Sequence, residues 1–180
     1  MKVCWGVPNR IVYALGFAHW KKRPLRLCFP DDEVRFVSGI DSVPDGGVLA
    51  VWGMRAVPEV SARGISLVRV EDGFLRSVGL GTDLTRPISW VVDRRGIYFD
   101  ATRPSDLEVL LAETAFSSDL LERAAALRTR IVAEGLTKYN VGTKVWRRPP
   151  RVTRVLLVPG QVESDASIAY GAPDIKTNLA

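Results

Sequence analysis

The sequence contains little histidine or cysteine and no long apolar run. Its 180 residues include one histidine, His19, and two cysteines, Cys4 and Cys28. Two cysteines without further ligands at suitable spacing indicate neither a zinc site nor a disulfide framework, and buried free thiols explain them better. The longest apolar runs are much shorter than the roughly 20 residues that cross a bilayer. The sequence therefore indicates no metal site, no bound cofactor and no membrane-spanning helix.

The sequence also lacks a secretory signal and long basic tracts. The opening segment MKVCWG has no charged region followed by an apolar stretch and a cleavage site, so we expect a cytoplasmic protein. The net charge of +5 favours anionic partners such as a sugar nucleotide, a phospholipid surface or nucleic acid. Its short basic clusters, at residues 21–23 and 147–148, are not interleaved with aromatic residues on a strand and are typical of solvated surface. We therefore expect no nucleic-acid partner.

Polar and acidic residues directly follow two apolar runs, at residues 65–70 and 154–158. Ligands of open α/β sheets bind at the carboxyl ends of strands, so both junctions are candidate parts of an active site. After the first run come Glu71, Asp72, Arg76, Ser77, Gly79 and Gly81, and after the second come Gln161, Glu163 and Asp165.

Alternating apolar runs and helical spacings predict an α/β fold with a Rossmann-like parallel sheet and flanking helices. We expect strands at residues 2–5, 34–37, 48–52 and 65–70, and helices at 9–20 and 57–63. Residues 88–92 and 96–100 read as a hairpin or as paired strands. The aromatic residues in or beside these runs are interpreted as core, and they are Trp52, Phe74, Trp90, Tyr98 and Phe99.

Two helices with clear start signals follow. Ser105 is expected to cap residues 106–115, with Glu108 completing a capping box, and Ser118 to cap residues 119–134, which Gly135 ends. Pro149 and Pro150 interrupt both helix and sheet, which indicates a linker. We therefore predict a Rossmann-like domain at residues 1–146 and a linker at 147–152. Residues 153–180 would begin a second Rossmann-like domain, with a strand at 154–158 and a helix at 165–170.

Four segments carry a family resemblance. RVEDGFLRSVGLG, RPISWVVDRRGIYFDATRPSDLE, GLTKYNVG and VPGQVESDAS resemble, in this order and approximate spacing, KpsC/LipA-type members of the capsule polysaccharide biosynthesis family. The resemblance covers residues 48–179 and implies the first half of a two-domain, GT-B-type glycosyltransferase that uses CMP-Kdo. Family members carry a Lys-Pro-His-Pro segment in the second half, which this sequence lacks, and His19 is interpreted as a packing or surface residue. We therefore interpret the chain as a truncated or split member.

The resemblance implies a nucleophilic aspartate. Related Kdo transferases resemble retaining enzymes that form a covalent sugar adduct on an aspartate, and Asp165 is predicted for that role. Family members commonly carry two consecutive acids here, whereas Ser164 replaces one of them, so Glu163 remains open as an alternative. An ordinary helix cap is the structural explanation for Asp165.

Glu71, and after it Asp72, are candidates for the general acid or base, a role that requires a pKa raised by burial. The alternative is a buried ion pair with Arg69 or Arg76, because an acid beside an arginine is usually an ionised structural partner.

Arg76 could bind the Kdo carboxylate or an acceptor phosphate with its forked guanidinium. Ser77, Gly79 and Gly81 would let the backbone approach the substrate, although a turn with positive φ at either glycine explains them equally. Further substrate-binding candidates are Lys138, Asn140, Gln161 and Glu163; the first two also suit a solvated loop.

The resemblance thus implies retaining β-Kdo transfer from CMP-Kdo to a lipid-linked Kdo or phospholipid acceptor, at the inner face of the cytoplasmic membrane. The chain alone would lack the nucleotide-binding half and could be inactive. The alternative is a non-catalytic component of capsule polysaccharide assembly or export, which would bind assembly or export proteins.

Overall fold

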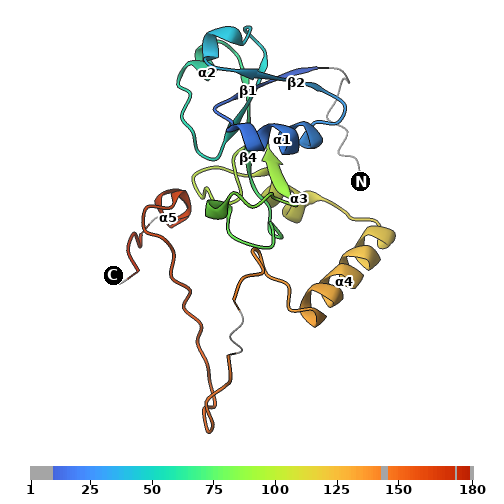
Figure 1. The fold of residues 1–180 in the computed structure, drawn as a ribbon, viewed down its shortest axis with the longest axis vertical. Helices are drawn as coiled ribbons and strands as arrows, with labels where there is room; N and C mark the ends of the chain where they lie inside the picture. Colours follow the sequence, from blue (N-terminus) through green and yellow to red (C-terminus); the bar gives the residue numbers. More distant parts are fainter. Residues whose placement is uncertain (1–9, 143–145, 173, 179–180) are drawn as a thin grey trace.

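The computed structural model describes residues 10–142, 146–172 and 174–178, and its centre is a five-stranded sheet (Figure 1). The strand order is β2-β1-β3-β4-β5. The first four strands are parallel, and β5 is antiparallel to β4. The strands are β1 (Ile11–Leu15), β2 (Glu33–Val37), β3 (Val48–Trp52), β4 (Ser66–Asp72) and β5 (Trp90–Asp93).

Each face of the sheet has its own apolar core, because neighbouring residues of a strand point to opposite faces. On one face, Ala50 packs in a cluster with Leu25 of α1 (Lys22–Cys28). On the other, Leu49 and Val51 pack in a cluster with Val60 of α2 (Glu59–Ala62). Helices on both faces of a mainly parallel sheet confirm the predicted Rossmann-like α/β class.

The helix α3 (Asp106–Glu113) begins with the expected signal, because Ser105 caps it and forms the predicted capping box with Glu108. The predicted cap of the next helix, α4 (Ser118–Ala133), is wrong: the helix begins one residue earlier, Ser117 occupies the cap position, and its side chain makes no capping hydrogen bond. Gly135 follows the end of α4 with a φ of +62°. Figure 1 shows α4 set apart from the sheet, and none of its residues is buried. A third helix, α5 (Ala166–Gly171), is capped by Asp165.

The predicted helix at residues 9–20 is wrong where the structure describes it. Residues 11–15 form β1, and the helix begins only at Lys22, after the short 3₁₀ turn η1 (His19–Lys21). The apolar spacing of a short buried strand and of a helix cannot be told apart, and the β-branched and aromatic residues at 11–13 favour the strand. The strand predicted at residues 2–5 lies outside the described residues.

The predicted hairpin at residues 88–100 is also wrong. The strand β5 pairs with β4, whereas residues 96–100 form a loop. The buried carboxylate of Asp93 accepts hydrogen bonds from the backbone N–H groups of Arg95 (2.9 Å), Gly96 (2.8 Å) and Asp106 (2.9 Å). These bonds turn the chain toward α3 and take the place of strand pairing.

Residues 154–158 do not form the predicted strand. Their apolar side chains are exposed, with Leu157 and Val158 each 87% exposed, and no described strand pairs with them. A strand requires hydrogen-bonding partners on at least one edge, so the apolar pattern alone is insufficient.

Candidate active site

A cleft of about 720 Å³ lies where β4 ends. Figure 1 shows α5 beside the loops that follow β4. A hydrogen bond of 3.0 Å from the backbone N–H of Ala101 to the carbonyl oxygen of Tyr170 attaches α5 there. The cleft thus brings together Glu71, Asp72 and Gly81 from the first sequence junction and Gln161 and Asp165 from the second. Lys138 also lines it.

Glu71 is the carboxylate whose environment best suits proton transfer. Burial raises the pKa of Glu71, whereas the hydrogen bond that its Oε1 accepts from the Asp72 N–H, at 2.9 Å, lowers it less. Gly53, at the end of β3, leaves room for this side chain, because a Cβ there would lie 3.1 Å from Glu71 Oε2. A carboxylate with a raised pKa is a stronger proton acceptor than one with the ordinary value.

Asp72 is instead bound to a buried arginine. Its Oδ2 lies 2.9 Å from Nε of Arg76, whose side chain is only 2% exposed. The same guanidinium donates from Nη1 to Ser77 Oγ and to the Thr85 carbonyl oxygen, each at 3.0 Å. With these internal contacts the arginine holds Asp72 in place, which favours the ion-pair interpretation over direct binding of substrate by Arg76.

The glycine loop after β4 is shaped by internal contacts. Ser77 Oγ donates to the Gly79 carbonyl oxygen at 2.7 Å. Gly79 has a φ of +110°, and a Cβ there would lie 2.8 Å from Thr85 Oγ1, so glycine is required by the turn. A Cβ at Gly81 would lie 3.1 Å from Nη2 of Arg76, and Gly81 also lines the cleft. Of these three residues, Gly81 is therefore the one placed to approach a ligand.

The segment at residues 138–140 supports the same loop. The Lys138 carbonyl oxygen accepts from the N–H groups of Arg76 (2.8 Å) and Ser77 (3.2 Å), and the residue lines the cleft. Asn140 has a φ of +51° and donates from Nδ2 to the Ser77 carbonyl oxygen at 3.0 Å. Asn140 does not line this cleft, and these contacts describe a structural turn.

Asp165 enters the cleft at the start of α5. Its Oδ1 accepts from the Ser167 N–H at 2.8 Å, as a helix cap does, while its Oδ2 accepts no hydrogen bond from the described residues. Gln161 also lines the cleft and donates from Nε2 to Ser167 Oγ at 3.1 Å. Glu163 accepts from the Asn178 N–H at 2.9 Å and does not line the cleft. The geometry therefore favours Asp165 over Glu163 for a role in the cleft.

Lys21 lies near these carboxylates, although its basic cluster was interpreted as solvated surface. Its Nζ lies 3.0 Å from the ring centroid of Trp52. Burial lowers the pKa of Lys21 to about 8, while the charges of Glu71 and Asp72 act in the opposite direction. No sequence signal marks this position of Lys21, because it depends on how the chain turns after β1.

Tyr98 and Phe99 also line the cleft, so the interpretation of the aromatic residues as core is incomplete. The Tyr98 hydroxyl donates to the Asp72 carbonyl oxygen at 3.2 Å, and burial raises the pKa of Tyr98 to about 12. Phe74 packs against Tyr98 with ring centroids 5.0 Å apart, yet it is 56% exposed. The motif GIYFD, which is part of the family resemblance and contains Tyr98 and Phe99, is the sequence signal that could have placed both residues at the site.

Within the described residues, no group of three His, Cys, Asp or Glu side chains is arranged to hold a metal ion. Across the same residues, no helix has both the length and the apolar character needed to cross a membrane.

The fold and the cleft together define a Rossmann-like α/β unit with carboxylates at the carboxyl end of its sheet. A family model described as "Capsule polysaccharide biosynthesis protein" matches residues 52–144. The chain is 37% identical over 178 residues to the capsule polysaccharide modification protein LipA of Neisseria meningitidis, and 42% identical over 192 residues to the lipopolysaccharide-processing protein LpsZ of Rhizobium meliloti. These alignments cover 93% and 96% of this chain. The chain belongs to the capsule polysaccharide biosynthesis family.

Solved structures of similar fold agree with this assignment. The chain resembles a KpsC β-Kdo 2,7 transferase of Thermosulfurimonas dismutans, with a TM-score of 0.67 and 35% identity over 94% of this chain. It also resembles a β-Kdo 2,4 transferase structure of KpsC from the same organism, with a TM-score of 0.66, 30% identity and 87% coverage. The chain spans 25% of LipA, 43% of LpsZ, and 55% and 50% of the two solved chains.

Proposed function

We propose that this chain forms part of a retaining β-Kdo transferase of capsule polysaccharide biosynthesis, which transfers Kdo from CMP-Kdo to a lipid-linked acceptor. The observation that carries the proposal is the single cleft that gathers Glu71 and Asp72 with Asp165, although more than half of the chain separates them in sequence. The printed titles of the similar solved structures, β-Kdo 2,7 and 2,4 transferase, support this substrate class.

In the proposed reaction, Asp165 is the nucleophile. Its carboxylate attacks the anomeric carbon of Kdo as the bond to CMP breaks, and CMP leaves with the bonding electron pair. An acceptor hydroxyl then attacks the same carbon, Glu71 takes the hydroxyl proton, and the bond to Asp165 breaks. Two displacements restore the original anomeric configuration. The raised pKa of Glu71 supports its role as the proton acceptor.

The donor and the acceptor are anionic, and the cleft offers cations and polar groups. Lys138 and Gln161 line it, and Lys21 is close enough for its charge to interact with Glu71 and Asp72. We assign Lys138 and Gln161 to substrate contacts, with the Gly81 backbone beside them. Arg76 is assigned to positioning Asp72, because its guanidinium is already hydrogen bonded within the protein.

The test measures CMP release and Kdo transfer to a synthetic lipid-linked Kdo acceptor. The 180-residue chain is compared with the same chain extended by the second half of a KpsC-type relative, and the extended form is also made as Asp165→Asn, Glu71→Gln and Glu163→Gln. We expect transfer by the extended protein, and loss of at least about 100-fold in the first two variants. Asp119→Asn, an exposed change on α4, is the matched control and should leave transfer intact.

The same series separates Asp165 from Glu163. Loss of transfer in Glu163→Gln, with Asp165→Asn still active, would move the nucleophile to Glu163. A folded extended protein that neither releases CMP nor transfers Kdo would refute the transferase proposal.

The alternative, a non-catalytic assembly component, is favoured by the structural bonds that Asp165 and Asp72 already make. It predicts binding to capsule assembly or export proteins that Asp165→Asn leaves unchanged.

A further inference from the structure

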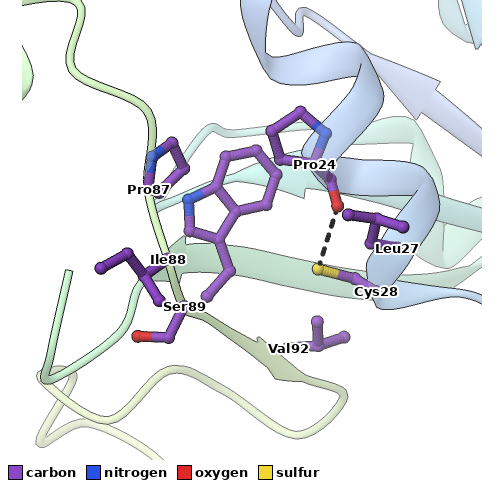
Figure 2. A pocket seen from close by; sticks show the side chains of 8 residues that line it. Pro24, Leu27, Cys28, Pro87, Ile88, Ser89 and Val92 are labelled. Atoms are coloured by element: carbon purple, nitrogen blue, oxygen red, sulfur yellow. Dashed lines mark hydrogen bonds between the residues drawn. The ribbon is translucent and has the colours of Figure 1, made fainter. Parts of the chain in front are cut away.

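A second surface feature lies apart from the candidate active site. Two adjoining clefts, of about 480 and 440 Å³, lie between α1 and residues 86–92, and we call them together the α1 groove. They share Pro24, Leu27 and Pro87. Figure 2 shows the first cleft, with Pro24 and Leu27 on the helix and Pro87 and Ile88 on the loop across from it. No lining residue is common to the α1 groove and the candidate active-site cleft.

The α1 groove carries large apolar side chains that the fold leaves in solvent. Leu27 is 76% exposed and Ile88 is 77% exposed. Contiguous exposed apolar side chains, in contrast to isolated ones, mark a surface that contacts a partner or a membrane.

Cationic side chains surround this apolar surface. Arg23 and Arg86 line the second cleft together with His19 and Trp20, and neither cleft is lined by a carboxylate. Both arginines are exposed, and neither forms an ion pair or hydrogen bond with a described residue. Residues 17–29 of the sequence contain no acid at all. These charges are therefore available to an anionic partner.

We propose that the α1 groove is a docking surface for an anionic phospholipid bilayer. Exposed leucine and isoleucine can enter the headgroup region, where an amphipathic tryptophan ring also settles, while unpaired arginines bind lipid phosphates. Charge complementarity favours a bilayer, because an uncharged apolar partner offers no anion to Arg23 and Arg86. Nucleic acid offers no apolar surface to Leu27 and Ile88. The inference rests on this surface and does not depend on Kdo transfer.

The test is co-sedimentation of the 180-residue chain with sucrose-loaded vesicles of phosphatidylcholine alone or with 30% phosphatidylglycerol. We expect binding to the anionic vesicles only, and weakening as salt is added. Arg23→Gln with Arg86→Gln should weaken binding about 25-fold, since each cation near an anionic surface contributes about fivefold. The pair Leu27→Ser with Ile88→Ser should weaken it at least tenfold. Circular dichroism confirms that the variants fold.

The matched control removes two arginines from another surface. Arg123 and Arg128 on α4 are exposed, and changing both to glutamine gives the same net charge as the groove variant. We expect this control to bind like the unchanged protein. No binding to anionic vesicles, or equal loss in both arginine pairs, would overturn the proposal. A dimer in sedimentation equilibrium that Leu27→Ser with Ile88→Ser dissociates, without vesicle binding, would assign the groove to a second copy and overturn it as well.

Discussion

Replacing Arg76 by methionine removes the guanidinium that holds Asp72 while keeping an unbranched apolar stem. Asp72 is 17% exposed in its side chain, and its Oδ1 is buried without a hydrogen-bond partner. The 2.9 Å bond from Arg76 Nε to Oδ2 is therefore its main compensation for burial. The change also leaves Ser77 Oγ and the Thr85 carbonyl oxygen without a donor from Arg76.

Breaking a buried pair by removing one partner costs about 3–5 kcal/mol, because the other charge stays in a poorly solvated site. A chain of this size loses about 2–4 °C in Tm per kcal/mol, so Arg76→Met should lower Tm by about 6–20 °C. Thermal unfolding followed by circular dichroism measures this directly. Asp72→Asn added to Arg76→Met should recover part of the loss, since it removes the unpaired charge.

The matched control is Arg95→Met. The ion pair between Arg95 and Asp106, at 3.2 Å, joins side chains that are 60% and 30% exposed, so its loss should cost less than about 1 kcal/mol. The reasoning is refuted if Arg76→Met costs no more than Arg95→Met. It is equally refuted if the added Asp72→Asn recovers nothing.

Three further changes test local features of the fold by thermal or urea unfolding. Burial raises the pKa of Glu71, so ionisation of this carboxyl group above pH 4.5 destabilises the folded state. Glu71→Gln should therefore be more stable than the unchanged protein at pH 8 and equally stable near pH 4. Equal unfolding curves at pH 8 would contradict this. Ser105→Ala removes the capping box of α3 and should cost about 0.5–2 kcal/mol. Gly79→Ala should cost more than Gly135→Ala, because both have positive φ but only Gly79 would place a Cβ against another side chain, 2.8 Å from Thr85 Oγ1.

The central strands could be predicted because their signals are local. The strand β3 is a continuous apolar run that follows a Pro-Asp-Gly-Gly turn, and the mainly apolar residues 65–70 after Gly64 predict β4. The helix predicted over residues 11–15 is wrong because the spacing of five apolar residues fits a strand and a helix equally well, and only the residue types at 11–13 favour the strand. The strand predicted at residues 154–158 is wrong for a different reason. Their apolar pattern suits a strand, but a strand forms only where another strand can pair with it.

The candidate site could be predicted only in part from strand ends. Asp165 lies in the cleft as the cap of α5, whereas the strand that it was expected to follow, at residues 154–158, does not form. Glu71 lies in the cleft because the carboxyl end of β4 points there. Lys21 and Tyr98 could not be found in that way. Lys21 is placed by the turn after β1, and Tyr98 by the loop that the Asp93 carboxylate shapes, so both positions depend on tertiary contacts.

The cap formed by Asp165 and its proposed role as nucleophile are compatible, because they use different oxygen atoms. Oδ1 accepts the Ser167 N–H and so fixes the side chain, while Oδ2 accepts no hydrogen bond from the described residues. Asparagine retains an oxygen that can cap a helix, but it carries no charge and is a poor nucleophile. Asp165→Asn should therefore leave α5 intact while ending transfer, whereas Asp165→Ala should end transfer and destabilise α5 by about 1 kcal/mol. If the unchanged and Asp165→Asn proteins transfer Kdo equally well, Asp165 is a helix cap and not the nucleophile.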